Sequence, residues 1–208
     1  MCYPNVMEIS SAKILVVDDN PDNRDVLSRR LKRLGLAQIA EAADGIEALD
    51  RLRAEAFDLV LLDVMMPRMN GVEMLEVMRG EGRLEDTPVV MISAASELET
   101  VVRCIELGAE DYLPKPFNAA LLAARVRAVL EKKFLRAVNR VQLARLEAEL
   151  AEARLHQAAM LPTHFPVDPA LLDVHAEIVP ALEVGGDLYD FFEVVPGLYC
   201  VAVGDVAG

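Results

Sequence analysis

Cysteine is scarce in this sequence. The three cysteines are Cys2, Cys104 and Cys200, and they lie far apart along the chain. A disulfide framework or a structural zinc site needs more cysteines, or cysteines at characteristic short spacings. The sequence therefore predicts three unpaired thiols in a reducing cytoplasm, and it argues against a small secreted domain held together by disulfides.

Positive charge and long apolar runs are also in short supply. Lysine and arginine total 21 against 34 aspartates and glutamates, which gives a formal net charge of −13. Nucleic acid is not expected as a partner, because binding the phosphate backbone requires a basic surface. No apolar run is long enough to cross a membrane, and the N-terminus lacks a signal-peptide pattern. We expect a cytoplasmic protein with no membrane partner.

Apolar residues are nevertheless abundant, and they fall into short runs that alternate with helical patterns. They make up 53% of the 208 residues, which is typical of a globular protein with one or two domains. The expected strands are residues 13–17, 37–41, 58–62, 88–93 and 111–116. The expected helices are residues 24–34, 45–56, 72–80 and 97–108. This alternation predicts an α/β fold, a flavodoxin-like (βα)5 doubly wound parallel sheet.

Polar side chains stand where the predicted strands end. Asp18 and Asp19 follow the first strand, Asp63 follows the third, Ser93 ends the fourth and Lys115 lies in the fifth. In an open parallel sheet, functional residues gather just beyond the carboxyl ends of the strands. We therefore expect three acids, a hydroxyl and a lysine to converge at one edge of the sheet. The alternative is that these acids are only solvated loop residues.

This set of side chains suits the formation of an aspartyl phosphate. Three carboxylates without a cation would repel one another, whereas Mg²⁺ prefers oxygen ligands of this kind. A carboxylate can attack phosphorus and form an acyl phosphate. The central position of Asp63 makes it the expected nucleophile. Lys115 could pair with the new phosphoryl oxygens, and Ser93 could donate a hydrogen bond to one of them.

Four motifs in this region resemble the signature of response-regulator receiver domains. They are VVDDN, LLDVMMPRMNG, MISA and YLPKP, and the resemblance covers roughly residues 12–130. It implies that Asp63 is the phosphoacceptor of a two-component phosphorelay, phosphorylated by a histidine kinase. It further implies that Mg²⁺ is bound by Asp19 directly and by Asp18 largely through water. Asp63 and the backbone carbonyl of Met65 complete the implied magnesium site.

The same resemblance assigns the residues that read the phosphoryl group. Ser93 would be the switch hydroxyl, Tyr112 the switch aromatic, and Lys115 the phosphoryl-binding lysine. A cis peptide bond is expected before Pro116, since cis bonds are mainly a feature of proline.

A long helix is predicted after the last strand. From Asn118 to Met160 the chain contains neither proline nor glycine and is rich in strong helix formers. Apolar residues at 135, 138, 146, 150 and 153 fit a largely heptad seam, with a slip near 142 and glutamines at 142 and 157. We expect residues 131–161 to form a parallel coiled-coil linker in a homodimer, continuous with the last receiver helix. The alternative is a helix that packs on its own domain.

The remaining residues, 162–208, show β-like runs at 171–181, 183–195 and 198–208, with a turn at Pro196-Gly197. The segment resembles the start of a sporulation-protein-E-type PPM metal-dependent phosphatase through three pieces. They are Leu161-Pro162, the stretch from Pro180 to Phe192, and the stretch from Gly204 to Gly208. A GGDEF cyclase fits less well, because Leu-Tyr follows Gly-Gly-Asp.

The phosphatase resemblance implies metal ligation by Asp187, Asp205 and the carbonyl of Val206. It also implies Mg²⁺ or Mn²⁺ as the metal and a phosphoserine or phosphothreonine in an anti-anti-sigma-like protein as the substrate. Because the sequence ends at Gly208, inside the second motif, we expect this chain by itself to lack phosphatase activity. The alternative function is a receiver and coiled-coil module for dimerisation and protein interaction, with a non-catalytic C-terminal segment.

Overall fold

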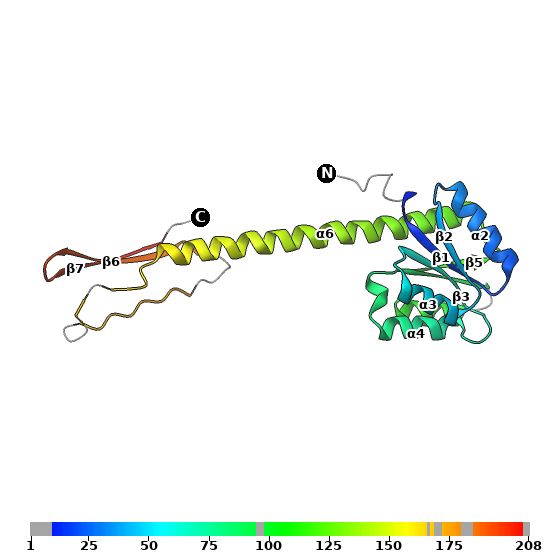
Figure 1. Cartoon of the computed structure of the whole chain (residues 1–208), viewed down its shortest axis with the longest axis horizontal. Helices are drawn as coiled ribbons and strands as arrows, with labels where there is room; N and C mark the ends of the chain where they lie inside the picture. Colours follow the sequence, from blue (N-terminus) through cyan, green and yellow to red (C-terminus); the bar gives the residue numbers. More distant parts are fainter. Residues whose placement is uncertain (1–9, 95–97, 166, 169–171, 180–184, 206–208) are drawn as a thin grey trace. The chain divides into compact units, whose positions relative to one another are not determined.

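The computed structural model describes residues 10–94, 98–165, 167–168, 172–179 and 185–205. The chain divides into two compact units, Met1–Val138 and Asn139–Gly208. Figure 1 shows the helices and strands of both units, most of them labelled, and the two units are described separately below.

The first unit is built on a five-stranded parallel sheet in the order β2-β1-β3-β4-β5. The strands are β1 (Lys13–Val17), β2 (Gln38–Ala42), β3 (Leu59–Asp63), β4 (Val89–Ala94) and β5 (Asp111–Lys115). All of β3 is buried, because helices cover both faces of the sheet. The predicted flavodoxin-like (βα)5 fold is confirmed, including the weak strand expected at 37–41.

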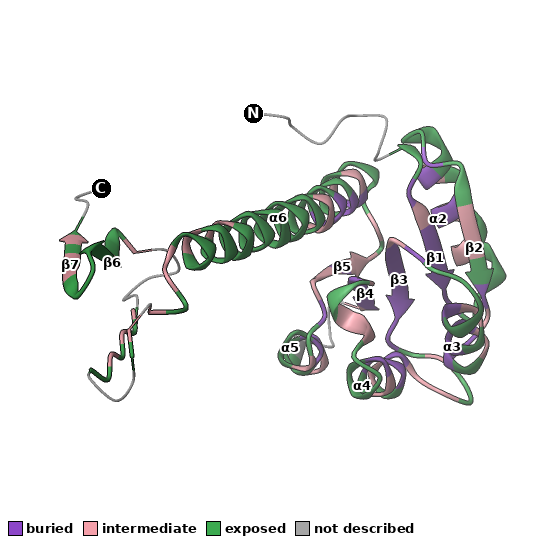
Figure 2. Ribbon diagram, turned by 60° about the vertical axis from the view of Figure 1, so that its left-hand side comes forward, coloured by how far each residue is buried: buried purple, intermediate pink, exposed green. Residues whose placement is uncertain are grey.

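Helices lie on both faces of this sheet. They are α2 (Pro21–Arg33), α3 (Gly45–Ala54), α4 (Gly71–Gly80), the 3-10 turn η1 (Arg83–Glu85), α5 (Leu98–Leu107) and α6 (Ala119–Met160). Buried residues of α3, α4 and α5 pack in one hydrophobic cluster with strand residues. Buried residues of α2 and of the first turns of α6 pack in a second cluster on the other face. Figure 2 shows how burial concentrates on the strands and on the start of α6.

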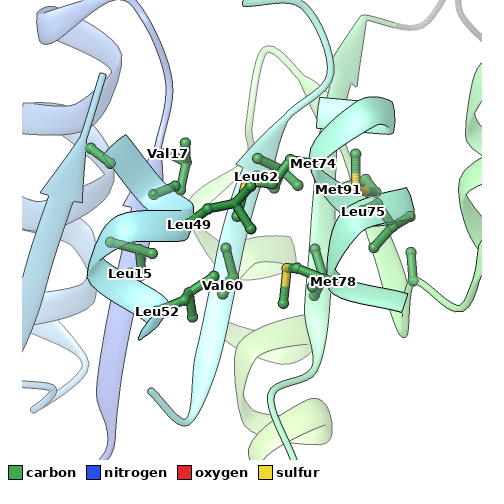
Figure 3. Packing of buried hydrophobic residues seen from close by; sticks show 14 of the residues in the cluster. Leu15, Val17, Leu49, Leu52, Val60, Leu62, Met74, Leu75, Met78 and Met91 are labelled. Atoms are coloured by element: carbon green, nitrogen blue, oxygen red, sulfur yellow. The ribbon is translucent and has the colours of Figure 1, made fainter. Parts of the chain in front are cut away.

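The first cluster fixes the strands that carry the polar residues (Figure 3). Its labelled members are Leu15, Val17, Val60, Leu62 and Met91 from the strands, with Leu49, Leu52, Met74, Leu75 and Met78 from α3 and α4. Burying a large apolar side chain contributes about 1.5–3 kcal/mol. The carboxyl ends of β1, β3 and β4 are therefore held in place by tightly packed side chains beneath them.

Several helices of this unit, α2, α3 and α4 among them, begin at polar caps that the sequence supplies. Asn20 accepts a hydrogen bond from the Asp22 amide at 2.9 Å, and Pro21 occupies the first turn of α2. Asp44 caps α3, and Asn70 forms a capping box with Glu73 at the start of α4. These caps place the helix starts directly after the carboxyl ends of the strands.

Salt bridges tie the first part of α6 to the amino ends of the strands. Glu110, just before β5, pairs with Lys132 and with Arg136, whose Nη1 lies 3.0 Å from a Glu110 carboxylate oxygen. Lys133 Nζ donates to Asp58 at 2.7 Å. Burial acts to raise the pKa of Glu110, but the two cations outweigh it and lower the pKa.

Replacing Glu110 with glutamine is expected to reduce the stability of the first unit at neutral pH by about 1 kcal/mol or less, because its partners are half exposed. A lowered carboxyl pKa contributes stability above the ordinary value of 4.5 that is lost as the pH falls through the folded value. Urea unfolding at pH 7 and at pH 3 checks this, since the difference from wild type should be smaller at the lower pH. An equal difference at both pH values would contradict it.

Beyond these contacts α6 continues as a largely exposed helix. It spans 42 residues without a break, as the sequence predicted. Among the residues that the structure describes, no helix combines the length and apolarity needed to cross a bilayer.

The second unit contains a β-hairpin, β6 (Asp187–Val195) and β7 (Leu198–Asp205), joined at Gly197 with a φ of 80°. Phe165 packs edge-on against Phe191 of β6. The strand expected at 171–181 is wrong for its described part, residues 172–179, which form no strand. An alternating pattern becomes a strand only where a neighbouring strand supplies backbone hydrogen bonds, and no strand within the described part of the chain pairs with residues 172–179.

Candidate functional site

The carboxyl edge of the sheet gathers the predicted acids. Ligand oxygens of Asp18, Asp19 and Asp63 lie within 4.8 Å of one another, and this is the only group of three or more potential metal-ligating side chains found within the described ranges. Asp18 and Asp63 are buried and Asp19 is exposed. The arrangement follows from the topology, since β1 and β3 are neighbours that end at the same edge.

Lys115 reaches this acid cluster from the end of β5. Its Nζ lies 2.8 Å from Oδ2 of Asp63 and 3.0 Å from Oδ2 of Asp18. Burial acts to lower the pKa of Lys115, but the hydrogen bonds to Asp63 and Asp18 outweigh it and raise the pKa. The lysine is therefore charged at neutral pH, and it is shared between two carboxylates.

Asp63 lies in an environment that disfavours its charge. Burial raises the pKa of its carboxyl group, and the negative charges of Asp18 and Asp19 add to the rise. The hydrogen bond and charge of Lys115 act in the opposite direction without cancelling it. One lysine thus leaves three clustered carboxylates under-compensated, a condition that a divalent cation relieves.

Asp18 is fully buried and held by several donors of the chain. The backbone amide of Asn20 donates to its Oδ1 at 2.9 Å, and Nδ2 of Asn23 lies 3.1 Å from each carboxylate oxygen. Arg24 donates to the carbonyl oxygens of Asp18 and Asp19. Sequence reasoning missed Asn23 and Arg24. Their position in the first turn of a helix that follows the acidic strand end is the signal that could have found them.

The loop between β3 and α4 is fixed at both ends. The Gly71 amide donates to the Val64 carbonyl at 2.9 Å. Further along, Arg68 adopts a left-handed φ of 65° and pairs with the buried Asp44. Met65 lies in this loop with its side chain exposed. Asp44 and Arg68 were not singled out from the sequence.

The two predicted switch residues lie on neighbouring strands. Ser93 is buried near the end of β4, one residue before Ala94, which pairs with Lys115 of β5. Tyr112, on β5, is half-buried and packs against the cluster formed with α3, α4 and α5. The expected cis peptide between Lys115 and Pro116 is confirmed.

The second unit brings two of its three predicted metal ligands opposite each other. Asp187 of β6 is paired directly with Asp205 of β7 in the antiparallel register. Like charges directly opposite on a hairpin destabilise it, so a cation between them would be favourable. Val206, the third predicted ligand, lies outside the described residues.

Comparison with known proteins identifies the first unit. The family model described as "Response regulator receiver domain" matches residues 14–127. The chain belongs to the response regulator receiver family. The match covers all of the parallel sheet except Lys13, the first residue of β1, and it includes the strand ends that carry the acid cluster.

Curated relatives and solved structures agree with this assignment. The chain is 42% identical over 122 residues to Response regulator MprA of Mycobacterium tuberculosis, covering 59% of this chain and 52% of the relative. It is 41% identical over 126 residues to Probable transcriptional regulator ycf27 of Cyanophora paradoxa, covering 61% of this chain and 51% of the relative. The chain thus spans about half the length of these curated relatives.

Among solved structures, the receiver domain of NtrX from Brucella abortus is 36% identical, with a TM-score of 0.54, and the match covers 57% of this chain and 98% of that one. The receiver domain of the Francisella response regulator 1452 is 30% identical with a TM-score of 0.54, covering 59% and 98%. These matches support a receiver fold for the first unit, and they extend over little more than half of the chain.

The acid cluster of this receiver domain fits Mg²⁺. A hard divalent ion takes oxygen ligands, and three carboxylates offer them within a small space. Burial raises the pKa of Asp63, and the charges of Asp18 and Asp19 add to the rise against the opposing charge of Lys115, so a cation bound beside these carboxylates would be favourable. Receiver domains are phosphorylated by histidine kinases, so both the donor set and the family indicate a site for phosphoryl chemistry.

Proposed function

We propose that this protein is a response regulator in which a histidine kinase phosphorylates Asp63 in the presence of Mg²⁺. The observation that carries the proposal is the placement of Asp63. It is a buried carboxylate at the end of the central strand, with Lys115 at 2.8 Å and two more acids beside it. Asp18, Asp19, Asp63 and the carbonyl of Met65 would hold the metal ion.

The transfer uses a carboxylate oxygen of Asp63 as the nucleophile. It attacks the phosphorus of a phosphohistidine, a new P–O bond forms, the P–N bond breaks, and the imidazole nitrogen keeps the electron pair. Lys115 compensates the charge on the phosphoryl oxygens, and the Ser93 hydroxyl donates a hydrogen bond to one of them. Bound Mg²⁺ supplies further charge neutralisation for the carboxylates and the phosphoryl group.

Phosphorylation then creates new charge in a site flanked by Ser93 and Tyr112. Ser93 is buried on β4, and Tyr112 on β5 packs against the cluster containing α4 and α5. If Ser93 and Lys115 move toward a phosphoryl group, Tyr112 can adopt a different packing. This would change the packing of the sheet face that α4 and α5 cover.

The test is phosphorylation of the full chain with acetyl phosphate and Mg²⁺, read as intact mass. One added phosphoryl group on the wild type is expected, and none on Asp63→Ala. Asp58→Ala is the matched control, because Asp58 is an aspartate immediately before the amino end of β3, whereas Asp63 is at its carboxyl end. Asp58 accepts a hydrogen bond from Lys133 and lies outside the acid cluster. Equal uptake by wild type and Asp63→Ala would overturn the assignment of Asp63, and so would uptake by neither protein.

For the output, we propose that α6 pairs with α6 of a second copy as a parallel coiled coil. The helix exposes a series of large apolar side chains: Leu135, Val138, Val141, Leu143, Leu146, Leu150 and Leu155. A helix that displays such residues to solvent gains stability by burying them against another helix. Light scattering of the chain before and after phosphorylation checks this, since a monomer in both states would contradict the coiled coil.

We further propose that residues 162–208 begin a PPM-type serine/threonine phosphatase domain, with an anti-anti-sigma-like phosphoprotein as substrate. The pairing of Asp187 with Asp205 supports it. A second support is the hydrogen bond that the Gln157 side chain donates to the Gly185 carbonyl at 2.6 Å, which joins the Gly-Gly-Asp segment to the end of α6. The complete phosphatase domain would use Mg²⁺ or Mn²⁺. Metal-dependent phosphate release by a chain extended with the rest of the domain, lost in Asp187→Asn, tests it.

The competing proposal is a receiver and coiled-coil interaction module whose C-terminal segment has no catalytic role. It predicts phosphorylation-dependent dimerisation with no phosphatase activity in the extended chain. The phosphate-release assay therefore separates the two outputs, and neither result changes the proposed role of Asp63.

A further inference from the structure

Asp18 is the most enclosed acid of the receiver site, with no exposed surface. Its Oδ1 accepts from the backbone amide of Asn20 at 2.9 Å and from Asn23 Nδ2 at 3.1 Å. Its Oδ2 accepts from Lys115 Nζ at 3.0 Å and again from Asn23 Nδ2 at 3.1 Å. Asn23 is thus the only one of these donors that reaches both oxygens.

Phosphorylation of Asp63 would affect these hydrogen-bond donors of Asp18 differently. Lys115 is shared with Asp63, at 2.8 Å, and a phosphoryl group on Asp63 would compete for it. The Asn20 amide serves only Oδ1. When Lys115 turns toward the phosphoryl oxygens, the Asn23 amide is the contact left to Oδ2 of Asp18.

We propose that Asn23 is a positioning residue that holds the Asp18 carboxylate in the orientation in which it serves bound Mg²⁺, before and after Lys115 turns to the phosphoryl group. The inference rests on the proposed function of this site, and it adds a residue that neither the family match nor the acid cluster assigns. Asn23 acts through Asp18 and does not itself bind the metal.

The chemistry of an amide suits this task. A lysine or arginine at position 23 would pair with Asp18 and compete with the cation, and an aspartate would add a fourth negative charge. The neutral amide donates without changing the charge of the cluster. Its position is also fixed, because Asn20 caps α2 and Pro21 restrains the first turn of the helix, two residues before Asn23.

The experiment compares the full-length wild type with Asn23→Leu, which keeps the size of the side chain and removes the donor, and Asn23→Gln, which keeps the amide. Asn139→Leu is the matched control, because it makes the same exchange at an exposed position of α6. Isothermal titration calorimetry with MgCl₂ gives the Mg²⁺ dissociation constant without any phosphorylation. The rate of Asp63 phosphorylation by acetyl phosphate is then followed against Mg²⁺ concentration, and Tm is recorded.

Asn23→Leu is expected to weaken Mg²⁺ binding about tenfold, the size expected for losing a hydrogen bond to a charged group. The rate at saturating Mg²⁺ should change far less than the half-saturating concentration. Asn23→Gln should recover most of the affinity, and Asn139→Leu should match the wild type.

Two results would overturn the inference. One is an unchanged Mg²⁺ dissociation constant in Asn23→Leu. The other is a lower Tm with an equal loss of rate at every Mg²⁺ concentration, which would mean that Asn23 only supports α2. Failure of the proposed function is distinguishable, because it would appear as a wild type that takes up no phosphoryl group, while calorimetry still reports on Asn23.

Discussion

Replacing Lys115 with methionine is expected to slow the phosphorylation of Asp63 about a hundredfold, the usual order for removing one positioned charge from a reaction that develops negative charge. Lys115 Nζ lies 2.8 Å from Asp63 and 3.0 Å from Asp18, so it already stands where the phosphoryl oxygens would arrive. Methionine preserves most of the apolar side-chain length and removes only the cation. The initial rate with acetyl phosphate at saturating Mg²⁺ measures the effect.

Loss of Lys115 should also make the fold depend more strongly on Mg²⁺. The raised pKa of Asp63 reflects burial and the charges of Asp18 and Asp19, and Lys115 is the group that opposes them. Without it, the carboxylates of Asp18 and Asp63 lose the lysine that bonds to both of them, and a bound divalent ion stabilises the folded state by mass action. The rise in Tm on adding MgCl₂ should therefore be larger in Lys115→Met than in the wild type.

Lys32→Met is the control for both measurements, because Lys32 is an exposed lysine on α2 outside the acid cluster. It should leave the phosphorylation rate and the response to Mg²⁺ unchanged. If Lys115→Met is phosphorylated as fast as the control, then Lys115 is a structural counter-ion and has no part in the transfer.

The strand ends could be predicted from the sequence because buried parallel strands are continuous apolar runs. The run over Leu59–Leu62 is fully buried, and the acid that follows it can only lie at the sheet edge. Once the order of strands is that of a doubly wound sheet, Asp18, Asp19 and Asp63 meet by topology alone. The convergence of these acids therefore needed no knowledge of side-chain conformation.

The residues that the sequence did not reveal are those whose partners depend on side-chain direction. Asn23 reaches Asp18 only because the first turn of α2 directs it back to the end of β1. Asp44 and Arg68 meet across two separate loops. No spacing rule links such pairs, since their contact depends on how each loop leaves its strand.

Gln157 is a polar residue in an apolar helical seam, a sequence pattern that can arise for two different physical reasons. In the sequence it interrupts an apolar seam, as a polar residue in a coiled coil would. In the structure its amide pairs with the backbone of Gly185, which lies in the same unit. A helical position alone does not distinguish these two roles, because both place one polar side chain among apolar neighbours.

Replacing Gly71 with alanine is expected to destabilise the receiver unit by about 3 kcal/mol, which is large for a single added methyl group. A Cβ at this position would lie 2.2 Å from the carbonyl oxygen of Asp63 and 3.0 Å from Cα of Val64. Both atoms belong to backbone. The backbone of Asp63 cannot move aside, because β3 is paired with β1 and with β4.

Glycine is required at position 71 because the start of α4 lies against the backbone of Asp63. The same backbone contact links the packing of α4 to the position of the phosphoacceptor. Gly71 donates its amide to the Val64 carbonyl at 2.9 Å, so α4 starts directly against the end of β3. A shift that admits the methyl group would displace Asp63 and the loop that carries Met65. We therefore expect weaker Mg²⁺ binding along with the loss of stability.

Gly80→Ala provides the matched control at the other end of the same helix, because a Cβ there would meet nothing within 4 Å. Alanine favours helix over glycine by about 0.8–1 kcal/mol in a helix interior, so this variant should be as stable as the wild type or slightly more so. Urea unfolding of the three proteins, followed by far-UV circular dichroism, gives the comparison. Similar unfolding midpoints for Gly71→Ala and Gly80→Ala would mean that the end of β3 shifts to accommodate the added methyl group. The close packing of α4 on β3 would then not determine the position of Asp63.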